Sequence, residues 1–331
     1  MMDRDARIFV AGHRGLVGSA IVRALRAAGH THLLLRTRDE LDLRDPVATA
    51  AFFEKAKPDH VFLAAARVGG ILANQREPAD FIRDNLQIQT NVIHEAWRTG
   101  VQRLLFLGSS CIYPRLAPQP LREEYLLTGP LEPTNRAYAL AKIAGIEMCW
   151  SHNRQHGTRF LAAMPTNLYG PEDNFDLDSS HVIPALLRKF HEARANGAPR
   201  VTLWGSGEPR REFMHSFDMA QACLFLMNLD DDRFDGLLGS DEAVTGRFEP
   251  PLINIGVGED ISIRELAETI ASVVGYGGLI EHDLSKPDGT PRKLMDVSRL
   301  NALGFRARIG LVDGLRQVHQ VVFAAPHTDL A

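Results

Sequence analysis

The sequence predicts an α/β protein built on a doubly wound parallel sheet, with a smaller C-terminal α/β lobe. Three observations support this prediction. Short apolar runs alternate with longer amphipathic segments through the first half of the 331-residue chain, as in parallel strands joined by crossover helices. A glycine-rich turn follows the first apolar run. The second half is less regular and contains segments rich in Gly, Pro, Asp and Glu, which are typical of loops.

The elements of the first half follow from their apolar patterns. A short apolar run predicts a buried strand, and apolar residues at helical spacing predict a helix. The expected strands are Ile8–Val10, Leu33–Leu35, Val61–Ala65, Leu104–Leu107 and Phe160–Met164. The expected helices are Ser19–Ala28, Pro46–Lys55, Asp80–Thr99 and Tyr138–His156. Strands therefore alternate with crossover helices.

In the second half, helical signals return at Met214–Leu229 and at Ser262–Val274, where Ser262 and Glu265 form a capping box. Exposed loops are expected at Pro171–Ser180 and Asp230–Pro251. We find no internal repeat or low-complexity segment. The expected division is a cofactor domain of residues 1–165 with returns near 212–229 and 252–257, and a substrate lobe of residues 166–211 and 258–331.

Composition narrows the class of protein. Hydrophobic residues make up 45% and charged residues 24%, which is ordinary for a globular protein with a sizeable core. A formal charge of -4 argues against a nucleic-acid or anionic-membrane partner. Three cysteines without a CxxC pair predict neither a disulfide framework nor a metal site, and they favour the cytoplasm. No apolar stretch suggests a signal peptide or a membrane span.

Gly12, Gly15 and Gly18 stand where the first strand meets the first helix. Positions without side chains let the backbone approach a pyrophosphate, and a helix N-terminus offers free N–H groups to the anion. A tight turn without a ligand is the alternative, and three glycines at this place argue against it. The motif predicts a Rossmann-like dinucleotide site. Its GxxGxxG spacing resembles the extended members of the short-chain dehydrogenase/reductase superfamily.

The end of the second strand indicates which dinucleotide binds. An acidic residue there would accept from the ribose 2′-OH of NAD, but this chain has Arg36 and Arg38, with Arg14 in the glycine loop. Guanidinium groups suit a 2′-phosphate, so NADP(H) is favoured; solvated surface arginines are the alternative. Asp42 and Leu43 resemble the stretch that lies along the adenine in the extended members.

Tyr138 and Lys142 are four residues apart, hence on one face of a helix. A phenol exchanges protons poorly at neutral pH unless its anion is stabilised, and a neighbouring ammonium does this while holding the cofactor ribose. Ser109 and Ser110 follow the fourth strand at its carboxyl end, where open α/β sheets bind ligands. One of these serines with Tyr138 and Lys142 resembles the Ser-Tyr-Lys set of short-chain reductases. The sequence therefore predicts hydride transfer to a carbonyl.

Longer strings extend the resemblance. They are GHRG at 12–15, RTRDEL at 36–41, GSSCIYP at 108–114, MPTNLYG at 164–170, SHVIPA at 180–185 and KPDGTPRK at 286–293. These strings resemble the GDP-L-fucose synthase family, the 3,5-epimerases and 4-reductases of GDP-4-keto-6-deoxy-D-mannose. The similarity runs from Phe9 to about Phe305, with a gap near Asp230–Pro251.

The resemblance implies roles for further residues. Cys111 matches the family's epimerisation base and His181 its acid; by themselves they would be taken as a core cysteine and a solvated histidine. Lys189, Trp204 and Arg211 match positions that hold the GDP-sugar. Lys189 departs from an arginine of some members, and Leu279 replaces a basic residue. The remaining implied cofactor contacts are His13, Leu16, Val17, Leu107, Gly108, Pro165, Thr166, Asn167, Leu168 and His181.

The resemblance also implies a homodimer formed through two helices per subunit, here Asp80–Thr99 and Tyr138–His156. Two other functions fit the residues. A nucleotide-sugar epimerase or dehydratase of the same fold would recycle its cofactor, and the arginines after the second strand argue against it. A non-catalytic NADP-binding sensor would keep the fold without the chemistry, and the intact Tyr138–Lys142 pair argues against that.

Overall fold

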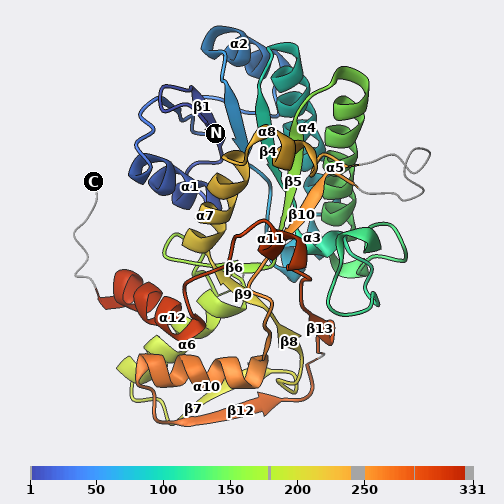
Figure 1. The fold of residues 1–331 in the computed structure, drawn as a ribbon. Helices are drawn as coiled ribbons and strands as arrows, with labels where there is room; N and C mark the ends of the chain where they lie inside the picture. Colours follow the sequence, from blue (N-terminus) through green and yellow to red (C-terminus); the bar gives the residue numbers. More distant parts are fainter. Residues whose placement is uncertain (1, 178–179, 240–249, 287, 325–331) are drawn as a thin grey trace.

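The chain folds into a parallel sheet flanked by helices, with a smaller lobe packed at one end of the sheet (Figure 1). The computed structural model describes residues 2–177, 180–239, 250–286 and 288–324. The lobe lies at the end of the sheet where the strands finish, because the chain enters it directly from the last residues of two strands, β5 and β10. The predicted fold class is confirmed.

The main sheet has six parallel strands in the order β10-β5-β4-β3-β1-β2. Their bounds are β1 Ile8–Ala11, β2 Leu33–Leu34, β3 His60–Leu63, β4 Arg103–Leu107, β5 Phe160–Pro165 and β10 Leu252–Ile255. All strand residues are buried except those of β2 and the last one of β5, which explains their continuous apolar runs. The connections turn in opposite directions on the two sides of β1, so the ligand crevice is expected at its carboxyl end.

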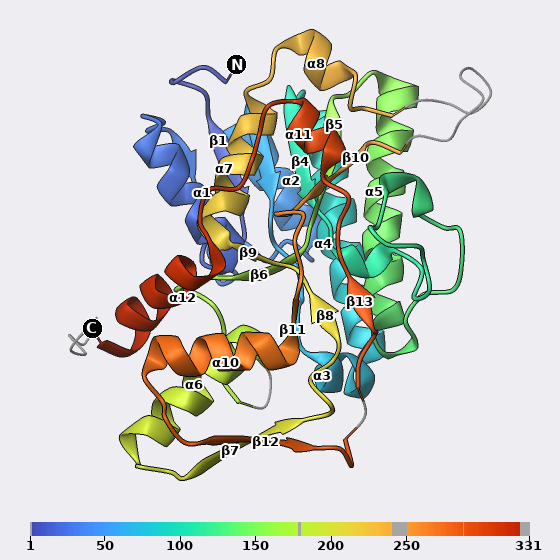
Figure 2. The same ribbon diagram turned by 60° about the horizontal axis from the view of Figure 1, so that its bottom comes forward.

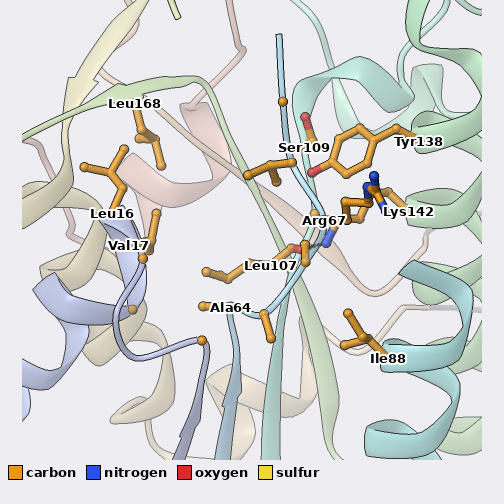
Figure 3. Close-up of a pocket in the computed structure, with 18 of the residues that line it drawn as sticks. Leu16, Val17, Ala64, Arg67, Ile88, Leu107, Ser109, Tyr138, Lys142 and Leu168 are labelled. Carbon is orange, nitrogen blue, oxygen red and sulfur yellow. Dashed lines mark hydrogen bonds between the residues drawn. The ribbon is translucent and has the colours of Figure 1, made fainter. Parts of the chain in front are cut away.

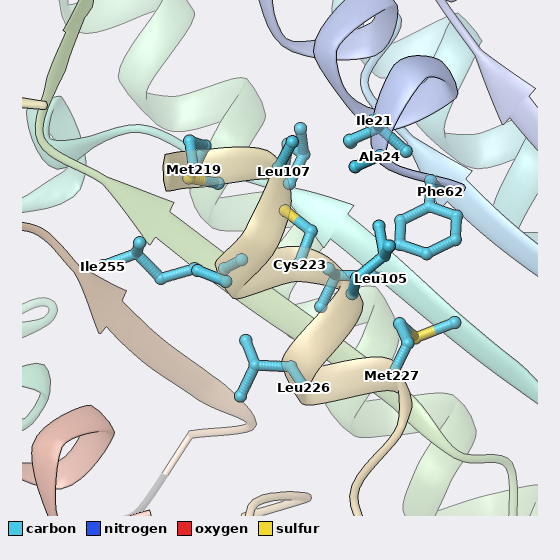
Figure 4. Packing of buried hydrophobic residues seen from close by; sticks show 14 of the residues in the cluster. Ile21, Ala24, Phe62, Leu105, Leu107, Met219, Cys223, Leu226, Met227 and Ile255 are labelled. Carbon is cyan, nitrogen blue, oxygen red and sulfur yellow. The ribbon is translucent and has the colours of Figure 1, made fainter. Parts of the chain in front are cut away.

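Helices cover both faces of the sheet. One face is covered by α1 Leu16–Ala27 and α7 Ser216–Met227, and the other by α2 Pro46–Ala56, α4 Pro78–Arg98 and α5 Arg136–His156. Figure 4 shows Cys223 of α7 next to Leu105 of β4. Burying each large side chain of this kind contributes about 1.5–3 kcal/mol, so the two helix layers hold the strand ends in fixed positions.

The small lobe is built from short sheets and its own helices (Figure 2). In the described residues, β6 pairs with β9, β7 pairs with β12, and β11, β8 and β13 form a third sheet. The strand bounds are β6 Asn167–Tyr169, β7 Arg200–Trp204, β8 Arg210–Arg211, β9 Phe213–His215, β11 Ile261–Ser262, β12 Leu279–Asp283 and β13 Arg292–Lys293. The helices α6 Val182–Ala195, α10 Ile263–Val274 and α12 Leu311–His319 enclose a separate core around Phe190, Leu266 and Leu315.

Shorter helices complete the described chain. They are α3 Ile71–Arg76, α8 Asp231–Asp235 and α11 Ser298–Ala302, with 3₁₀ turns at Ser110–Ile112, Glu123–Tyr125 and Pro133–Asn135 and a π-helical turn at Gln320–Ala324. Nowhere in residues 2–177, 180–239, 250–286 and 288–324 does a helix have the length and apolar character needed to cross a lipid bilayer.

Glu212, between β8 and β9, ties several chain segments together. It is fully buried, and its carboxylate accepts from the backbone N–H groups of Val257 at 2.6 Å, Gly258 at 2.8 Å and Met295 at 2.8 Å. Burial raises the pKa of this carboxyl, and the three N–H donors counteract the increase. A Cβ at Gly256 would lie 2.2 Å from the Glu212 Oε1 atom, so a side chain there would displace the carboxylate from its N–H donors.

Several element predictions need correction. The segment Met214–Leu229 begins as strand β9 and becomes helical only at Ser216. The first helix starts at Leu16, directly after the loop glycine Gly15, rather than at Ser19. The capping box of Ser262 and Glu265 is confirmed.

The segment Asp230–Pro251 is not simply an exposed loop, because it contains α8 with the buried side chain of Phe234. The buried guanidinium of Arg103 stacks on that ring at 4.2 Å and pairs with Asp231 at 2.6 Å, so α8 is held at the start of β4. Residues 240–249 of this segment lie outside the described residues.

Candidate active site

A cavity of about 730 Å³ runs along the carboxyl ends of β1, β3, β4 and β5. Figure 3 shows it between the glycine loop, with Leu16 and Val17, and helix α5, with Tyr138 and Lys142. The predicted site residues that line it are Gly12, Gly15, Leu16, Val17, Gly18, Arg36, Arg38, Asp42, Leu43, Leu107, Gly108, Ser109, Ser110, Tyr138, Lys142, Pro165, Thr166, Asn167, Leu168 and His181. His13 and Arg14 are not part of the lining, and their contacts with a cofactor stay predictions.

The glycine loop has the close packing that a pyrophosphate cradle requires. Gly12 has a φ of 82°, a conformation that favours glycine. A Cβ at Gly18 would lie 2.1 Å from the Gly12 carbonyl oxygen, so a side chain there would force loop and helix apart. Gly15 precedes α1 without a side-chain cap, which leaves the first N–H groups of the helix available to an anion. The loop therefore fits a dinucleotide.

Arg36 and Arg38 lie at the β2 end of the cavity. The Arg36 guanidinium donates to the Leu35 carbonyl oxygen at 2.7 Å and lies 5.7 Å from the ring centre of Phe52. Within the described ranges, neither guanidinium is at ion-pair distance from a carboxylate. Two cations without carboxylate partners suit a 2′-phosphate better than a ribose hydroxyl, so the donor set fits NADP(H).

Asp42 is already engaged by a neighbouring arginine. Its Oδ2 atom lies 2.6 Å from Nη2 of Arg44, and hydrogen bonding to this guanidinium lowers the pKa of Asp42 to about 2. Asp42 is thus ionised across the physiological range and lies at the same end of the cavity as Arg38.

Sequence reasoning missed a second group of charged residues in the cavity wall. Asp84 of α4 is buried, with 3% of its surface exposed, and its carboxylate pairs with Arg67 at 2.9 Å, Arg83 at 2.9 Å and Arg44 at 3.4 Å. Arg67, Arg44 and Asp84 line the cavity. A signal was present, since Asp84 interrupts the apolar face of a predicted amphipathic helix.

At the other end of the cavity, Ser109, Tyr138 and Lys142 come together. Ser109 precedes the 3₁₀ turn after β4, and Figure 3 shows its side chain next to the phenol of Tyr138. Lys142 donates from Nζ to the Leu107 carbonyl oxygen at 2.7 Å and lies 5.8 Å from the ring centre of Tyr138. The structure therefore brings a hydroxyl, a phenol and an ammonium to one place.

The ionisation of this group differs from the expected one. Burial, followed by the nearby Cys111, raises the pKa of Tyr138, and a hydrogen bond with Ser109 lowers it only in part. Burial lowers the pKa of Lys142 to about 8, against a smaller opposite effect of Cys111. We expected the ammonium of Lys142 to lower the pKa of Tyr138. In the structure the pKa of Tyr138 is instead above its ordinary value. A neutral phenol is a proton donor.

Cys111 and His181 approach the site from different parts of the chain. Cys111 lies in the turn after Ser109 and is 5% exposed. Burial raises its thiol pKa, and the cations of Lys293 and Lys142 counteract part of the increase. His181 precedes α6 and lines the cavity, where desolvation lowers the pKa of its imidazole. Cys111 is not part of the cavity lining.

Lys293 of β13 was also missed. Burial lowers the pKa of its ammonium, and the neighbouring ionisable groups are Cys111, Arg211 and Glu132. No local pattern identifies it, because β13 is a two-residue strand. Lys293 brings a cation from the small lobe towards the thiol of Cys111.

The predicted substrate residues lie on the small lobe, outside the cavity lining. Lys189 is on α6 and Arg211 on β8, and burial lowers the pKa of Arg211. Trp204 ends β7 with 64% of its surface exposed, and Lys286 lies 5.3 Å from its ring centre. Leu279 on β12 is 65% exposed. A contact of these residues with a sugar nucleotide stays a prediction.

Comparison with known proteins gives concordant results. Residues 8–236 match the model of the NAD dependent epimerase/dehydratase family. GDP-L-fucose synthase 1 of Arabidopsis thaliana is 56% identical over 319 residues, which cover 96% of this chain and 94% of that protein. GDP-L-fucose synthase of Escherichia coli (strain K12) is 56% identical over 316 residues, covering 95% of each chain.

Two solved structures resemble this chain over nearly its whole length. GDP-mannoheptose C4 reductase from Campylobacter jejuni, solved with NADP bound, is 39% identical with a TM-score of 0.87, covering 97% of this chain and 99% of that one. A GDP-L-fucose synthetase from Naegleria fowleri bound to NADP is 27% identical with a TM-score of 0.84, covering 98% and 96%.

Proposed function

Because this chain belongs to the NAD dependent epimerase/dehydratase family and groups within it with the GDP-L-fucose synthases, we propose that it makes GDP-L-fucose from GDP-4-keto-6-deoxy-D-mannose. In this reaction C3 and C5 are epimerised and the C4 ketone is then reduced with NADPH. The cofactor is NADP(H), as in the related structures solved with NADP bound.

The observation that carries this proposal is that one cavity is lined by Ser109, Tyr138, Lys142 and His181, with Cys111 buried beside Tyr138. Ser109, Tyr138 and Lys142 are the residues of a carbonyl reductase. Cys111 adds a buried thiol that is hydrogen-bonded to Ser109. His181 adds an imidazole in the cavity wall. A plain reductase requires only the first group, whereas inversion at two carbons requires a base and an acid in addition.

We assign the proton transfers to residues of this chain. A ketone at C4 acidifies the hydrogens on C3 and C5. At each carbon in turn, Cys111 as thiolate, favoured by the cations of Lys293 and Lys142, removes a proton from one face and His181 gives a proton to the opposite face. Between the two inversions Cys111 releases its proton to water and His181 takes one up. NADPH supplies the hydride to C4. Tyr138 gives its phenolic proton to the C4 oxygen as the alcohol forms, Ser109 donates a hydrogen bond to that oxygen, and the Lys142 ammonium stabilises the developing phenolate.

Binding of the two ligands is divided between the two parts of the chain. The glycine loop would hold the pyrophosphate of the cofactor, and Arg36 and Arg38 its 2′-phosphate. Lys189 and Arg211 would pair with the diphosphate of the sugar nucleotide, and Trp204 would stack on its base. We therefore propose that the sheet with its helices is the cofactor domain and the small lobe the substrate domain, divided at the boundaries predicted from the sequence.

The chain is proposed to act as a homodimer in the cytoplasm. Helices α4 and α5 are neighbours on one face of the sheet and carry the half-exposed side chain of Leu140, which supports pairing with a second copy. Cys111, Cys149 and Cys223 are all free thiols, which suits a reducing compartment.

Purified protein incubated with GDP-4-keto-6-deoxy-D-mannose and NADPH tests the proposal. We expect one NADPH to be consumed for each GDP-L-fucose that chromatography identifies, and we expect Tyr138→Phe to lose at least about a hundredfold in turnover, as for loss of a general acid. Conversion of the keto-sugar without net cofactor consumption would instead indicate an epimerase or dehydratase. Binding of NADPH without any turnover would indicate a sensor.

A further inference from the structure

The ammonium of Lys142 lies over an aromatic ring of the main sheet. Phe106, on β4, is 1% exposed, and the Nζ atom of Lys142 lies 4.7 Å from the centre of its ring. The negative face of an aromatic ring attracts an ammonium, and the attraction is strongest where water is excluded. Lys142 is itself 3% exposed. The two side chains therefore meet both the geometric and the solvent condition for a cation–π interaction.

Few other groups stabilise this charge in the folded protein. The Lys142 ammonium donates to the Leu107 carbonyl oxygen at 2.7 Å, and in the described ranges no carboxylate lies at ion-pair distance from it. An ammonium has three N–H donors, so one carbonyl oxygen leaves part of its capacity unused. Burying a charge is unfavourable unless other interactions offset the loss of water. The face of the Phe106 ring supplies such an interaction.

A glycine in helix α5 lets the ring come this close. Gly145 follows Lys142 by three residues, so both lie on the same face of the helix. A Cβ at Gly145 would lie 2.4 Å from the Cζ atom of Phe106 and 2.6 Å from its Cε1 atom, which is too close for any side chain. Glycine inside a helix costs about 1 kcal/mol relative to alanine. Gly145 thus has a packing role, because the ring can lie against α5 only where the helix has no side chain.

We propose that Phe106 is a positioning residue of the reaction: the face of its ring holds the Lys142 ammonium charged and in place beside Tyr138, before any ligand binds. The Nζ atom lies 5.8 Å from the ring centre of Tyr138, and from this position the ammonium stabilises the phenolate. Phe106 is not part of the cavity wall, so it acts through Lys142. This inference rests on the role of Lys142 in the proposed function and adds a residue to it.

Other ionisable groups also surround Lys142. Tyr138 lies one turn away on the same helix, and burial raises its pKa. Cys111 follows β4, and as a thiolate it favours the ammonium. Arg67, in the loop after β3, lines the same cavity, where it pairs with Asp84 of α4. All of these groups stay present when Phe106 alone is substituted, so a changed pKa of Lys142 would report the loss of the ring.

NMR can measure the pKa of Lys142 directly, without ligand or turnover. Labelling the ε-carbon of lysine with ¹³C gives a simple spectrum, and Lys142→Arg identifies one signal by its loss. The chain has six lysines, Lys55, Lys57, Lys142, Lys189, Lys286 and Lys293. Burial lowers the pKa of Lys142 to about 8. In Phe106→Leu, which keeps the site apolar but offers no aromatic face, we expect this pKa to be about one unit lower than in wild type.

The sign of the shift separates the ring from a packing effect. Leucine is smaller than phenylalanine, and water entering the space left would raise the pKa of Lys142, not lower it. Phe62→Leu is the matched control. Phe62, on the neighbouring strand β3, is fully buried, and no cation lies over its ring in the described residues; this variant should leave the pKa of Lys142 unchanged.

A second variant of Phe106 keeps the fold close to that of wild type. Replacing Phe106 by a singly fluorinated phenylalanine retains the ring and nearly its size, but weakens the negative potential of its face. We expect the pKa of Lys142 to fall in this protein too, by less than in Phe106→Leu. The alkaline limb of kcat/KM for the keto-sugar should move to lower pH by the same amounts, because it reports the ionisation of Lys142.

The outcomes separate this inference from the proposed function. A graded fall in the pKa of Lys142, followed by the alkaline limb, supports the positioning role. An unchanged or raised pKa in the Phe106 variants, or an equal fall in Phe62→Leu, overturns it and leaves the proposed function intact. A lower pKa with an unmoved alkaline limb also overturns it, because Lys142 would then not set the limb. A wild type that oxidises no NADPH with the keto-sugar would remove the proposed function, and the positioning role with it.

Discussion

Lys142 allows a quantitative prediction for the alkaline limit of activity. Its ammonium is 3% exposed and donates to the Leu107 carbonyl oxygen at 2.7 Å. Burial lowers its pKa from 10.5 to about 8, a shift equivalent to about 3 kcal/mol against the charged form. For a lysine the charged form is present below this pKa and is lost as the pH rises through it. About nine-tenths of the molecules are charged at pH 7 and about one-tenth at pH 9.

Reduction requires the charged form, because only the ammonium stabilises the anion left on Tyr138 after proton transfer. We therefore expect kcat/KM for the keto-sugar to fall roughly tenfold between pH 7 and pH 9, since this parameter reports the pKa values of the free enzyme. Tyr138 does not contribute to this limb, because burial raises its pKa. Initial rates of NADPH oxidation in a buffer of constant ionic strength give the profile.

Lys142→Arg is the control for this assignment. Arginine keeps its charge to beyond about pH 12, so the variant should lose its alkaline limb even if its plateau is lower. A wild-type profile that stays flat to pH 9.5, or an unchanged alkaline limb in Lys142→Arg, would refute the reasoning.

Three further predictions test the chemistry, the cofactor preference and the stability. Cys111→Ser should lower GDP-L-fucose formation by about a hundredfold or more, as for loss of a catalytic base, while the Kd for NADP⁺ is kept; normal product formation on chromatography would contradict the assignment. Arg36→Ala should raise KM for NADPH about tenfold and leave KM for NADH nearly unchanged, and equal effects on both cofactors would speak against a 2′-phosphate contact. Burial lowers the pKa of His60 to about 4, so below pH 6.5 the imidazole binds a proton in the unfolded chain before it does in the folded one. His60 should therefore destabilise the fold by about 2 kcal/mol between pH 7 and pH 5. In urea unfolding, His60→Gln should lose about 2 kcal/mol less than wild type over this range, and an equal loss in both proteins would exclude the contribution of His60.

The parts of the site that could be predicted from the sequence are those whose geometry is local. The glycine loop and the Tyr138–Lys142 pair were identified because one turn, or one stretch of helix, fixes the spacing of their residues. Strand runs such as β4 could be predicted because burial on both faces demands uninterrupted apolar residues. Helix α6 was missed although Ile183, Leu187 and Phe190 have helical spacing.

The remaining features depend on contacts between distant segments. The charged group around Asp84 could not be predicted, because its partners Arg44 and Arg67 come from other segments of the chain. Loop composition predicted exposure for Asp173, yet its Oδ2 atom is shielded in the folded chain. The pKa of Tyr138 likewise reflects burial in the assembled fold and not the helical neighbour four residues away.

The carboxylate of Glu212 has a consequence for how the protein is made. Its three N–H partners belong to residues 257, 258 and 295, and the edge strand β10 pairs with β5, which precedes it by a long stretch of chain. During translation at about 5–20 residues per second, the first half of the chain waits on the order of ten seconds before these groups emerge. A nascent chain interrupted before Leu252 would leave β5 as an uncapped sheet edge and the Glu212 carboxylate without its three N–H partners. Synthesis of this protein should therefore depend on chaperones, or on the pace of the ribosome, more than its compact final form suggests.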